Sequence, residues 1–326
     1  MSTARGHHWV SQTYLARFTR EGHKHSKLHV VDLRQRKVFS TSPANICKER
    51  DFNRIESDTL PLDALETALS KFEDLAGGAL TEIQRAPEAI SWSNWNILLN
   101  FMALLAVRNP IIRDHVNTRA AEQWIRAIED ATNTPEKFAA VFAKAQAAGD
   151  IDKNLTPDFD KHREFITARR FTVEFPHGTH VPAEFDAVDD LLQQLGMRRW
   201  TVLRAPADCG GFVTTDRPVT PARRDGLHPS KKSPVDFRSE NTLVLFPLSP
   251  DLLALGHFGD ANRRLHLRDI SRELVARANF TTIRVCRQWV LAPNANFEVK
   301  PAQSAPTFLG NEILDLFGEW EGGGEA

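Results

Sequence analysis

The chain is poor in cysteine and tyrosine and has no long apolar run. It holds three cysteines in 326 residues, Cys47, Cys209 and Cys286, and they lie far apart. This number and spacing supply neither a disulfide framework nor a paired metal-ligand pattern, so we expect a reducing, cytoplasmic environment. The longest apolar stretch, residues 97–107, is interrupted by Asn100 and is too short to span a bilayer. We therefore expect no membrane association.

The signature motifs of several enzyme classes are also missing. The sequence has no Walker loop, no G-x-G-x-x-G, no G-x-S-x-G and no H-E-x-x-H. It therefore lacks the marks of nucleoside-triphosphate, dinucleotide, α/β-hydrolase and zincin chemistry. The histidine pairs at 23/25 and 177/180 match no recognised ligand spacing. We predict no bound metal and no other cofactor, with a divalent cation as the alternative.

The formal net charge of −1 excludes a strong overall electrostatic field, but the charges are unevenly distributed along the chain. Residues 1–50 carry a surplus of +7, residues 51–197 a deficit of −10, and residues 198–238 and 263–287 a surplus of +5 each. If the two basic ends fold together, they form one electropositive surface that favours nucleic acid or another anionic ligand. The alternative is that each surplus is a solvated face.

The periodicity of apolar residues changes along the chain from helical to strand-like. It predicts a short helix over 10–18, a β-hairpin over 28–40, about five helices within 62–170, and helices over 186–195 and 271–284. Thr134-Pro135 and Thr156-Pro157 each have the form of a helix start. Strands are predicted at 171–175, 200–204, 211–215, 241–246 and 252–256, with the second and third joined in a long hairpin.

These elements predict an α+β fold. An N-terminal helix and β-hairpin join a C-terminal antiparallel sheet, and a helical block is inserted between them. We expect a single integrated domain over 1–300, composed of an N-terminal helix and hairpin (1–60), the helical block (61–170) and the sheet-forming half (171–300). Residues 301–326 have the composition of an acidic tail, with a short helix at 309–317.

Residues 7–18 read His-His-Trp-Val-Ser-Gln-Thr-Tyr-Leu-Ala-Arg-Phe. They resemble the opening H-H-x-V-P-x-x-Y-L-x-x-F of a largely microbial family, domain of unknown function 4238. Further on, residues 108–110, 212–219 and 246–250 are similar to its R-x-P, F-x-T-S-D-x-P-V and P-L-S-P motifs. Ser11 stands where the family has proline, and Thr215 where it has serine. The likeness spans residues 7–291, and it indicates which residues matter without naming an activity.

His7, His8, Asp216 and Arg108 are the candidate catalytic residues. Imidazole both accepts and donates a proton near neutral pH. Because the side chains of consecutive helical residues point in different directions, we expect one histidine of the pair to face a site. Asp216 follows a strand and could orient a histidine or bind a cation, or else form an Asx turn. Arg108 follows an apolar helix and is either an anion clamp or half of a buried ion pair.

Four further residues are candidates for substrate binding: Tyr14, Gln12, Arg17 and Asn279. Tyr14 is the single tyrosine of the chain, and its alternative role is that of a core aromatic with its hydroxyl at the surface. Arg17 is a phosphate candidate whose alternative is solvent exposure. Asn279 lies in a late helix and could fix either a substrate or a loop.

The combination of a histidine pair with two basic segments favours a phosphodiester-cleaving enzyme, a nuclease or more specifically an RNase. One histidine would act as general acid or base, Asp216 would orient it, and Arg108 would stabilise phosphate charge. The alternative is a non-catalytic binding or regulatory module, such as a component of antiviral defence against phage. In that case His7, His8 and Asp216 only attach the amino terminus to the sheet. A small-molecule transferase or hydrolase is a third class.

Overall fold

A computed structural model describes residues 5–169, 171–175, 178–224, 235–259 and 265–318. The chain divides into two compact units. The first runs up to Pro110 and resumes at Val181, and the second comprises residues 111–180. Helices and mostly antiparallel sheets occur together, so the α+β class expected from the sequence is confirmed.

The first unit opens with short elements. These are β1 (Gly6–His8), α1 (Gln12–Leu15) with the 3-10 turn Ala16–Phe18, β2 (Leu28–Asp32), β3 (Lys37–Thr41), the 3-10 turn Pro43–Asn45, and β4 (Lys48–Arg50). The helix predicted over 10–18 and the hairpin predicted over 28–40 are both confirmed. Ser11 begins α1, because its hydroxyl accepts a hydrogen bond from the amide of Thr13 at 3.2 Å.

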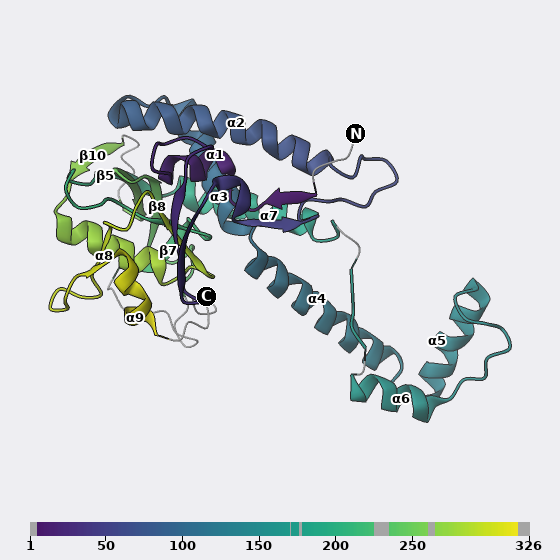
Figure 1. The fold of residues 1–326 in the computed structure, drawn as a ribbon. Coiled ribbons are helices and arrows are strands. Elements are labelled where there is room, and N and C mark those ends of the chain that lie inside the picture. The colour runs from purple at the N-terminus through teal and green to yellow at the C-terminus, as the bar shows by residue number, and fades with distance from the viewer. Residues whose placement is uncertain (1–4, 170, 176–177, 225–234, 260–264, 319–326) are drawn as a thin grey trace. The chain divides into compact units, whose positions relative to one another are not determined.

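Three helices of the first unit pack together. They are α2 (Ala64–Arg85), α3 (Trp92–Val107) and α7 (Val181–Gly196), and α3 contacts both of the others (Figure 1). The side chains of α3 are apolar on almost all sides of the helix, as expected for a helix buried between neighbours. Phe101 of α3 meets Tyr14 and Phe246, so the N-terminal helix and the sheet share this core.

Two larger sheets complete the first unit. The five-stranded sheet has the order β10 (His266–Asp269), β5 (Arg199–Arg204), β9 (Leu252–His257), β8 (Thr242–Ser249) and β7 (Thr220–Arg223), and only β10 and β5 are parallel. The four-stranded sheet has the order β3, β2, β11 (Trp289–Ala292) and β6 (Thr214–Thr215). This second sheet places the N-terminal hairpin beside the C-terminal part of the chain, as predicted.

The last elements of the first unit lie against the four-stranded sheet. They are α8 (Arg272–Ile283), β12 (Glu298–Val299), β13 (Phe308–Leu309), the 3-10 turn Gly310–Glu312 and α9 (Ile313–Phe317). Ser271 caps α8 as expected, and the short helix expected at 309–317 is confirmed. Ile313 is fully buried in a core shared with β11, so residues up to Gly318 belong to the fold. Residues 319–326 of the expected acidic tail lie outside the described residues.

The long hairpin expected between 200–204 and 211–215 is wrong. β5 and β6 belong to different sheets, and the chain crosses between them through Gly210 and Gly211. Both glycines have positive φ, +71° and +80°, and a Cβ on Gly211 would lie 2.5 Å from the carbonyl oxygen of Pro250. Only glycine fits there, and the amide of Phe212 donates to the same carbonyl at 2.7 Å.

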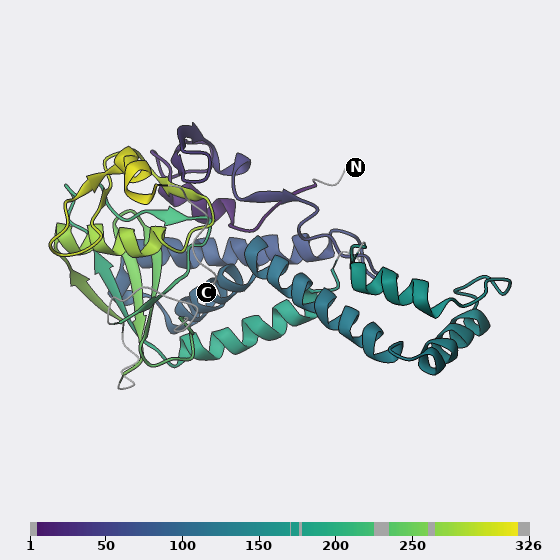
Figure 2. The ribbon, with the colours of Figure 1, turned by 90° about the horizontal axis from the view of Figure 1, so that it is seen from below.

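The second unit is helical. It contains α5 (Pro135–Ala148), α6 (Phe159–Ala168) and nearly all of α4 (Pro110–Ala131) (Figure 2). With α2 and α3, these are the five helices predicted within 62–170. Thr134 caps α5 as expected, whereas α6 is capped by Asp158 and not by Thr156, because the Asp158 carboxylate accepts from the amide of Lys161. Residues 171–175 form no strand.

Candidate functional site

His7 lies on β1, which pairs with β4, and its side chain is 4% exposed. Its Nδ1 accepts a hydrogen bond from the backbone amide of Asn53 at 2.8 Å. An imidazole nitrogen that accepts in this way carries no proton, so neutral His7 is protonated at Nε2. The first histidine of the pair therefore fixes the backbone that follows β4.

Asn53 links this histidine to Arg108. Its side-chain oxygen accepts from the Arg108 guanidinium, and its amide nitrogen donates to Glu66. The guanidinium Nε of Arg108 lies 3.6 Å from a carboxylate oxygen of Glu184, with both side chains buried. Of the two roles weighed for Arg108, the structure contains the buried ion pair. His7 and Arg108, distant in the sequence, thus share one residue, Asn53.

Glu73 extends this polar cluster along α2. Burial raises the pKa of its carboxyl to about 7, helped by the negative charge of Glu66, while a hydrogen bond from Ser11 and the charge of Arg108 oppose the rise. A carboxyl with this pKa exchanges protons near neutral pH. We call His7, Asn53, Glu66, Glu73, Arg108 and Glu184 the Asn53 cluster.

Sequence reasoning missed four members of this cluster. Glu66 and Glu73 are seven residues apart, within the stripe that also carries the buried Leu69 and Ala76. Two carboxylates on an apolar stripe of a helix are a signal that could have been used. Asn53 lies in the turn that directly follows β4. Nothing in the local sequence around Glu184 marks it as the partner of Arg108.

His8, on the other face of β1, is half-buried. Its Nδ1 is 3.5 Å from the side-chain nitrogen of Gln12, and its Nε2 faces the backbone carbonyls of Pro43 and Ala44 without a hydrogen bond of ordinary geometry. Burial, and then the charge of Lys48, lower the pKa of His8. His8 is therefore neutral at neutral pH, and Gln12 contacts it directly.

Asp216 is 1% exposed and binds backbone amides. One oxygen accepts from Arg287 N at 2.8 Å, and the other accepts from Gln288 N at 2.8 Å and Trp289 N at 3.2 Å. Burial raises the pKa of this carboxyl to about 6 against the opposing effect of these amides. The carboxylate thus holds the turn that leads into β11. The local turn weighed for Asp216 is made instead by Thr215, whose hydroxyl accepts from Arg217 N at 3.1 Å.

Trp9 joins the histidine pair to Asp216. Its indole nitrogen donates to the backbone oxygen of Asp216 at 3.2 Å, and its ring stacks on Trp289 with centroids 6.0 Å apart. Trp9 directly follows His8, so the amino terminus and the turn at Asp216 meet in one layer. The link runs through the indole and the Asp216 backbone, while the Asp216 carboxylate binds the amides of residues 287–289.

Asn279 and Tyr14 are both buried and hydrogen-bonded to other parts of the fold. The Asn279 side chain accepts from Val213 N at 3.0 Å and donates to Gly211 O at 3.0 Å and to Glu298 O at 2.9 Å. The Tyr14 hydroxyl lies 2.7 Å from the hydroxyl of Thr214 and donates to the carbonyl of Pro247 at 2.8 Å. Tyr14 is a core aromatic, but its hydroxyl is buried rather than at the surface.

Arg17 binds the middle and the end of α2. Its guanidinium donates to Gly77 O and to the Thr81 hydroxyl, each at 2.9 Å, and also to the Gln84 side chain. Burial lowers the pKa of Arg17 to about 10, so it stays charged at neutral pH. These bonds attach the turn after α1 to α2.

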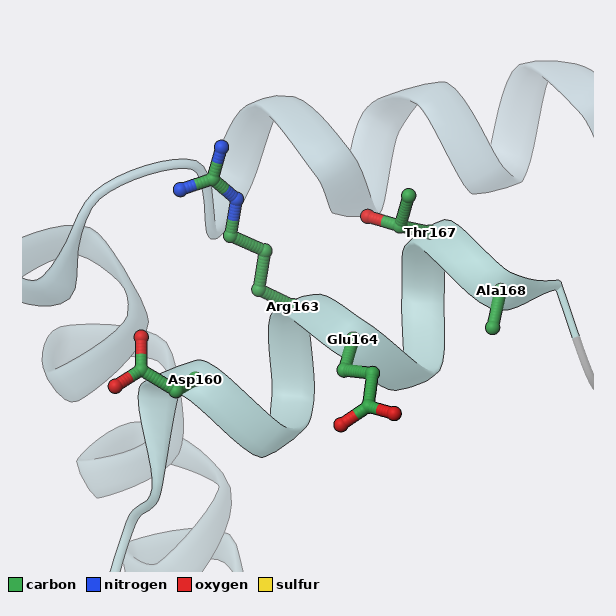
Figure 3. Close-up of a pocket in the computed structure, with 5 residues that line it drawn as sticks. All are labelled: Asp160, Arg163, Glu164, Thr167 and Ala168. Carbon is green, nitrogen blue, oxygen red and sulfur yellow. The ribbon is translucent and has the colours of Figure 1, made fainter.

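Among the described residues, no group of three or more histidine, cysteine, aspartate or glutamate side chains is placed to hold a metal ion. A hollow on the second unit is lined by side chains of α6 alone, namely Asp160, Arg163, Glu164, Thr167 and Ala168 (Figure 3). Figure 3 shows these side chains spread along one helix. None of the predicted site residues lines it.

The model of the family described as "Protein of unknown function (DUF4238)" matches residues 6–296. The chain belongs to this family. No curated protein and no solved structure matches it. Within the described residues, no single helix is long and apolar enough to cross a bilayer; α3 and α4 meet the criteria of length and composition only when taken together across a bend.

Proposed function

We propose that this DUF4238 protein is a binding or regulatory module, in which the histidine pair and Asp216 attach the amino terminus to the sheet. The observation that supports this most directly is the burial of Asp216 against the amides of residues 287–289. A catalytic carboxylate must reach substrate or a catalytic partner, whereas the hydrogen bonds of this one go to backbone. A role in defence against phage stays a prediction.

The burial of three other candidates also supports this proposal. His7 and Arg108 are 4% exposed and Asn279 is 1% exposed. Binding sites are concave and keep their polar groups within reach of the ligand. The excess of carboxyl groups in the Asn53 cluster disfavours a phosphate there, since the cluster holds Glu66, Glu73 and Glu184 and a single guanidinium.

His7→Ala and His8→Ala, made in the full chain, test this function. We expect both to lower the melting temperature, His7→Ala by more, because it leaves the Asn53 amide without its acceptor at a cost of about 1–3 kcal/mol. Incubated with labelled single- and double-stranded DNA and RNA, with and without Mg²⁺ or Mn²⁺, the unmodified protein should leave the strands intact. Cleavage that His8→Ala abolishes without a change in melting temperature would contradict the proposal.

A phosphodiester-cleaving enzyme is the second candidate, and Glu73 is the observation that favours it. With a pKa of about 7, its carboxyl could act as a general acid or base. The neutral imidazole of His8 would be the complementary group, as Glu66 acts electrostatically on both. In this case Glu73→Gln abolishes cleavage of the same nucleic acids, whereas Glu164→Gln, at an exposed position, leaves it unchanged.

A further inference from the structure

One end of the four-stranded sheet gathers arginines from segments far apart in the sequence. β11 pairs with β2 in the register Trp289 with Asp32, and the amide of Leu33 donates to Gln288 O at 2.9 Å. Arg287, which precedes β11, and Arg34, in the turn between β2 and β3, therefore lie at the same end of the sheet. Positive charges gathered at one end of a sheet favour the approach of an anion.

Two more arginines come from the neighbouring segments. Arg217 follows β6, and its guanidinium donates to Val285 O at 3.2 Å. Arg284 ends α8, and its guanidinium lies 5.6 Å from the ring centre of Phe280. The side chains of Arg217 and Arg284 therefore both belong to the turn formed by residues 284–287, Arg217 through its hydrogen bond and Arg284 as a member of the turn. We call Arg34, Arg217, Arg284 and Arg287 the arginine end of the sheet.

A further cation lies beside this group. Arg36, at the tip of the β2–β3 hairpin, donates to Leu314 O of α9 at 2.7 Å. Phe317 of α9 stacks on Phe280 with centroids 5.7 Å apart, so α9 contacts both Arg36 and the ring on which Arg284 lies. α9 and α8 lie next to each other in Figure 1. Arg34 and Arg36 of the first basic segment and Arg284 and Arg287 of residues 263–287 thus lie at this end of the sheet.

Two carboxylates at this end, those of Asp32 and Asp216, are directed into the protein, whereas the exposed carboxylate of Asp315 in α9 lies 3.6 Å from the Arg36 guanidinium. Asp32 is 1% exposed and accepts from Gln288 Nε2 at 2.8 Å and from Trp289 Nε1 at 3.1 Å. Asp216 is equally buried and binds the amides of residues 287–289. Arg34 is exposed, and Arg217, Arg284 and Arg287 are half-buried. These four arginines consequently lie nearer to solvent than the carboxylates of Asp32 and Asp216.

We infer that the arginine end binds the sugar–phosphate backbone of a nucleic acid. The planar guanidinium fork matches two phosphate oxygens at once, and all four cations are arginines. Adjacent strands are about 4.8 Å apart, so the arginines beside the ends of β2, β11 and β6 extend over about 10 Å. A ligand that meets all of them carries several phosphates along a chain. Burial also lowers the pKa of Arg217 and Arg284, a cost that bound phosphates would relieve.

The inference rests on the proposed binding function and names its partner. The test is fluorescence anisotropy of a labelled 20-nucleotide single strand of mixed sequence, titrated with the full chain over a salt series. We expect the logarithm of the affinity to fall linearly with the logarithm of salt concentration. The double variant Arg34→Gln/Arg284→Gln should lower this slope by about 1.4, or about 0.7 for each arginine, and weaken binding about 25-fold near 0.1 M salt.

Two control variants distinguish loss of the arginine end from loss of folding and from a general loss of positive charge. Arg85→Gln/Arg119→Gln removes two exposed arginines elsewhere and should bind like the unmodified protein. Arg34→Lys/Arg284→Lys keeps the charge and should recover most of the salt slope, with an unchanged melting temperature. Equal losses in the two glutamine variants, or no salt-dependent binding by the unmodified protein, would overturn the inference.

Competition distinguishes nucleic acid from an acidic protein segment. Compared at equal concentrations of negative charge, unlabelled oligonucleotide should displace the labelled strand far more effectively than polyglutamate does. Equal displacement by the two would overturn the assignment. The same samples run on a denaturing gel report strand cleavage. Absence of binding refutes the partner alone, whereas cleavage refutes the proposed non-catalytic function, so the two failures are distinguishable.

Discussion

The guanidinium of Arg108 lies 3.6 Å from the carboxylate of Glu184, and both side chains are at most 5% exposed. The pair joins the end of α3 to the beginning of α7. A buried ion pair contributes little net stability, because both charges lose their hydration, but removing one partner leaves the other charge uncompensated. The pair therefore makes the packing of these helices sensitive to single substitutions.

Glu184→Gln should lower the free energy of unfolding by about 3 kcal/mol, because Arg108 stays charged and buried without its carboxylate. Urea denaturation of the full chain measures this loss. The matched control is Asp190→Asn, which removes the carboxylate of an exposed pair with Arg238 and should change stability by less than about 1 kcal/mol. Similar urea midpoints for both variants would show that the buried pair has no special role.

Asp216→Asn should also destabilise the protein, although it changes only one atom of the side chain. The amide group would direct N–H bonds toward backbone amides that need an acceptor, either at Arg287 or at Gln288 and Trp289. A buried donor left unsatisfied costs about 1–3 kcal/mol. The melting temperature should fall, and hydrogen exchange of the amides at 287–289 should quicken. Unchanged exchange at these amides would refute this role of the carboxylate.

The local elements of the fold were predictable because their causes are local. Apolar residues spaced three and four apart define α2, and the sequence Thr134-Pro135 with Gly149 supplies both ends of α5. The β5–β6 hairpin was predicted wrongly because two strand-like segments joined by a turn are typical of a hairpin. What decides the path is the distant carbonyl of Pro250, which requires glycine at 211. No local pattern carries that information.

The candidate site was predictable in its residues but not in its contacts. The family motifs contain His7, Arg108 and Asp216, and Asn279 was a further candidate. All four are buried and hydrogen-bonded. Their partners are mostly backbone groups, and backbone groups leave no trace in a motif. Likewise, the meeting of the basic segments depended on the pairing of β11 with β2, which the charge count alone leaves open.

Asn279→Ala tests whether one side chain holds three separate segments together. Its loss leaves Val213 N without an acceptor and the carbonyls of Gly211 and Glu298 without this donor. We expect a loss of about 2–5 kcal/mol, larger than for an ordinary surface substitution. Asn154→Ala, at an exposed asparagine, is the control for the loss of an amide side chain. Equal urea midpoints for the two variants would contradict the prediction.

The raised pKa of Glu73 predicts how stability depends on pH. Its carboxyl has a pKa of about 7 in the folded chain and about 4.5 in the unfolded chain, so between these values the folded state binds more protons. Stability contributed by Glu73 is therefore fully present below pH 4.5 and is lost as the pH rises through 7, by up to about 3 kcal/mol.

Glu73→Gln isolates this contribution from that of the other titrating groups. Because glutamine stays neutral, the variant should gain stability relative to the unmodified protein as the pH rises from 5 to 8, and the two should converge near pH 4. Urea midpoints at each pH measure the difference. Glu164→Gln, at an exposed carboxylate, should give a flat difference over the same range. A flat difference for Glu73→Gln as well would mean that this carboxyl ionises as readily in the folded chain as in the unfolded one.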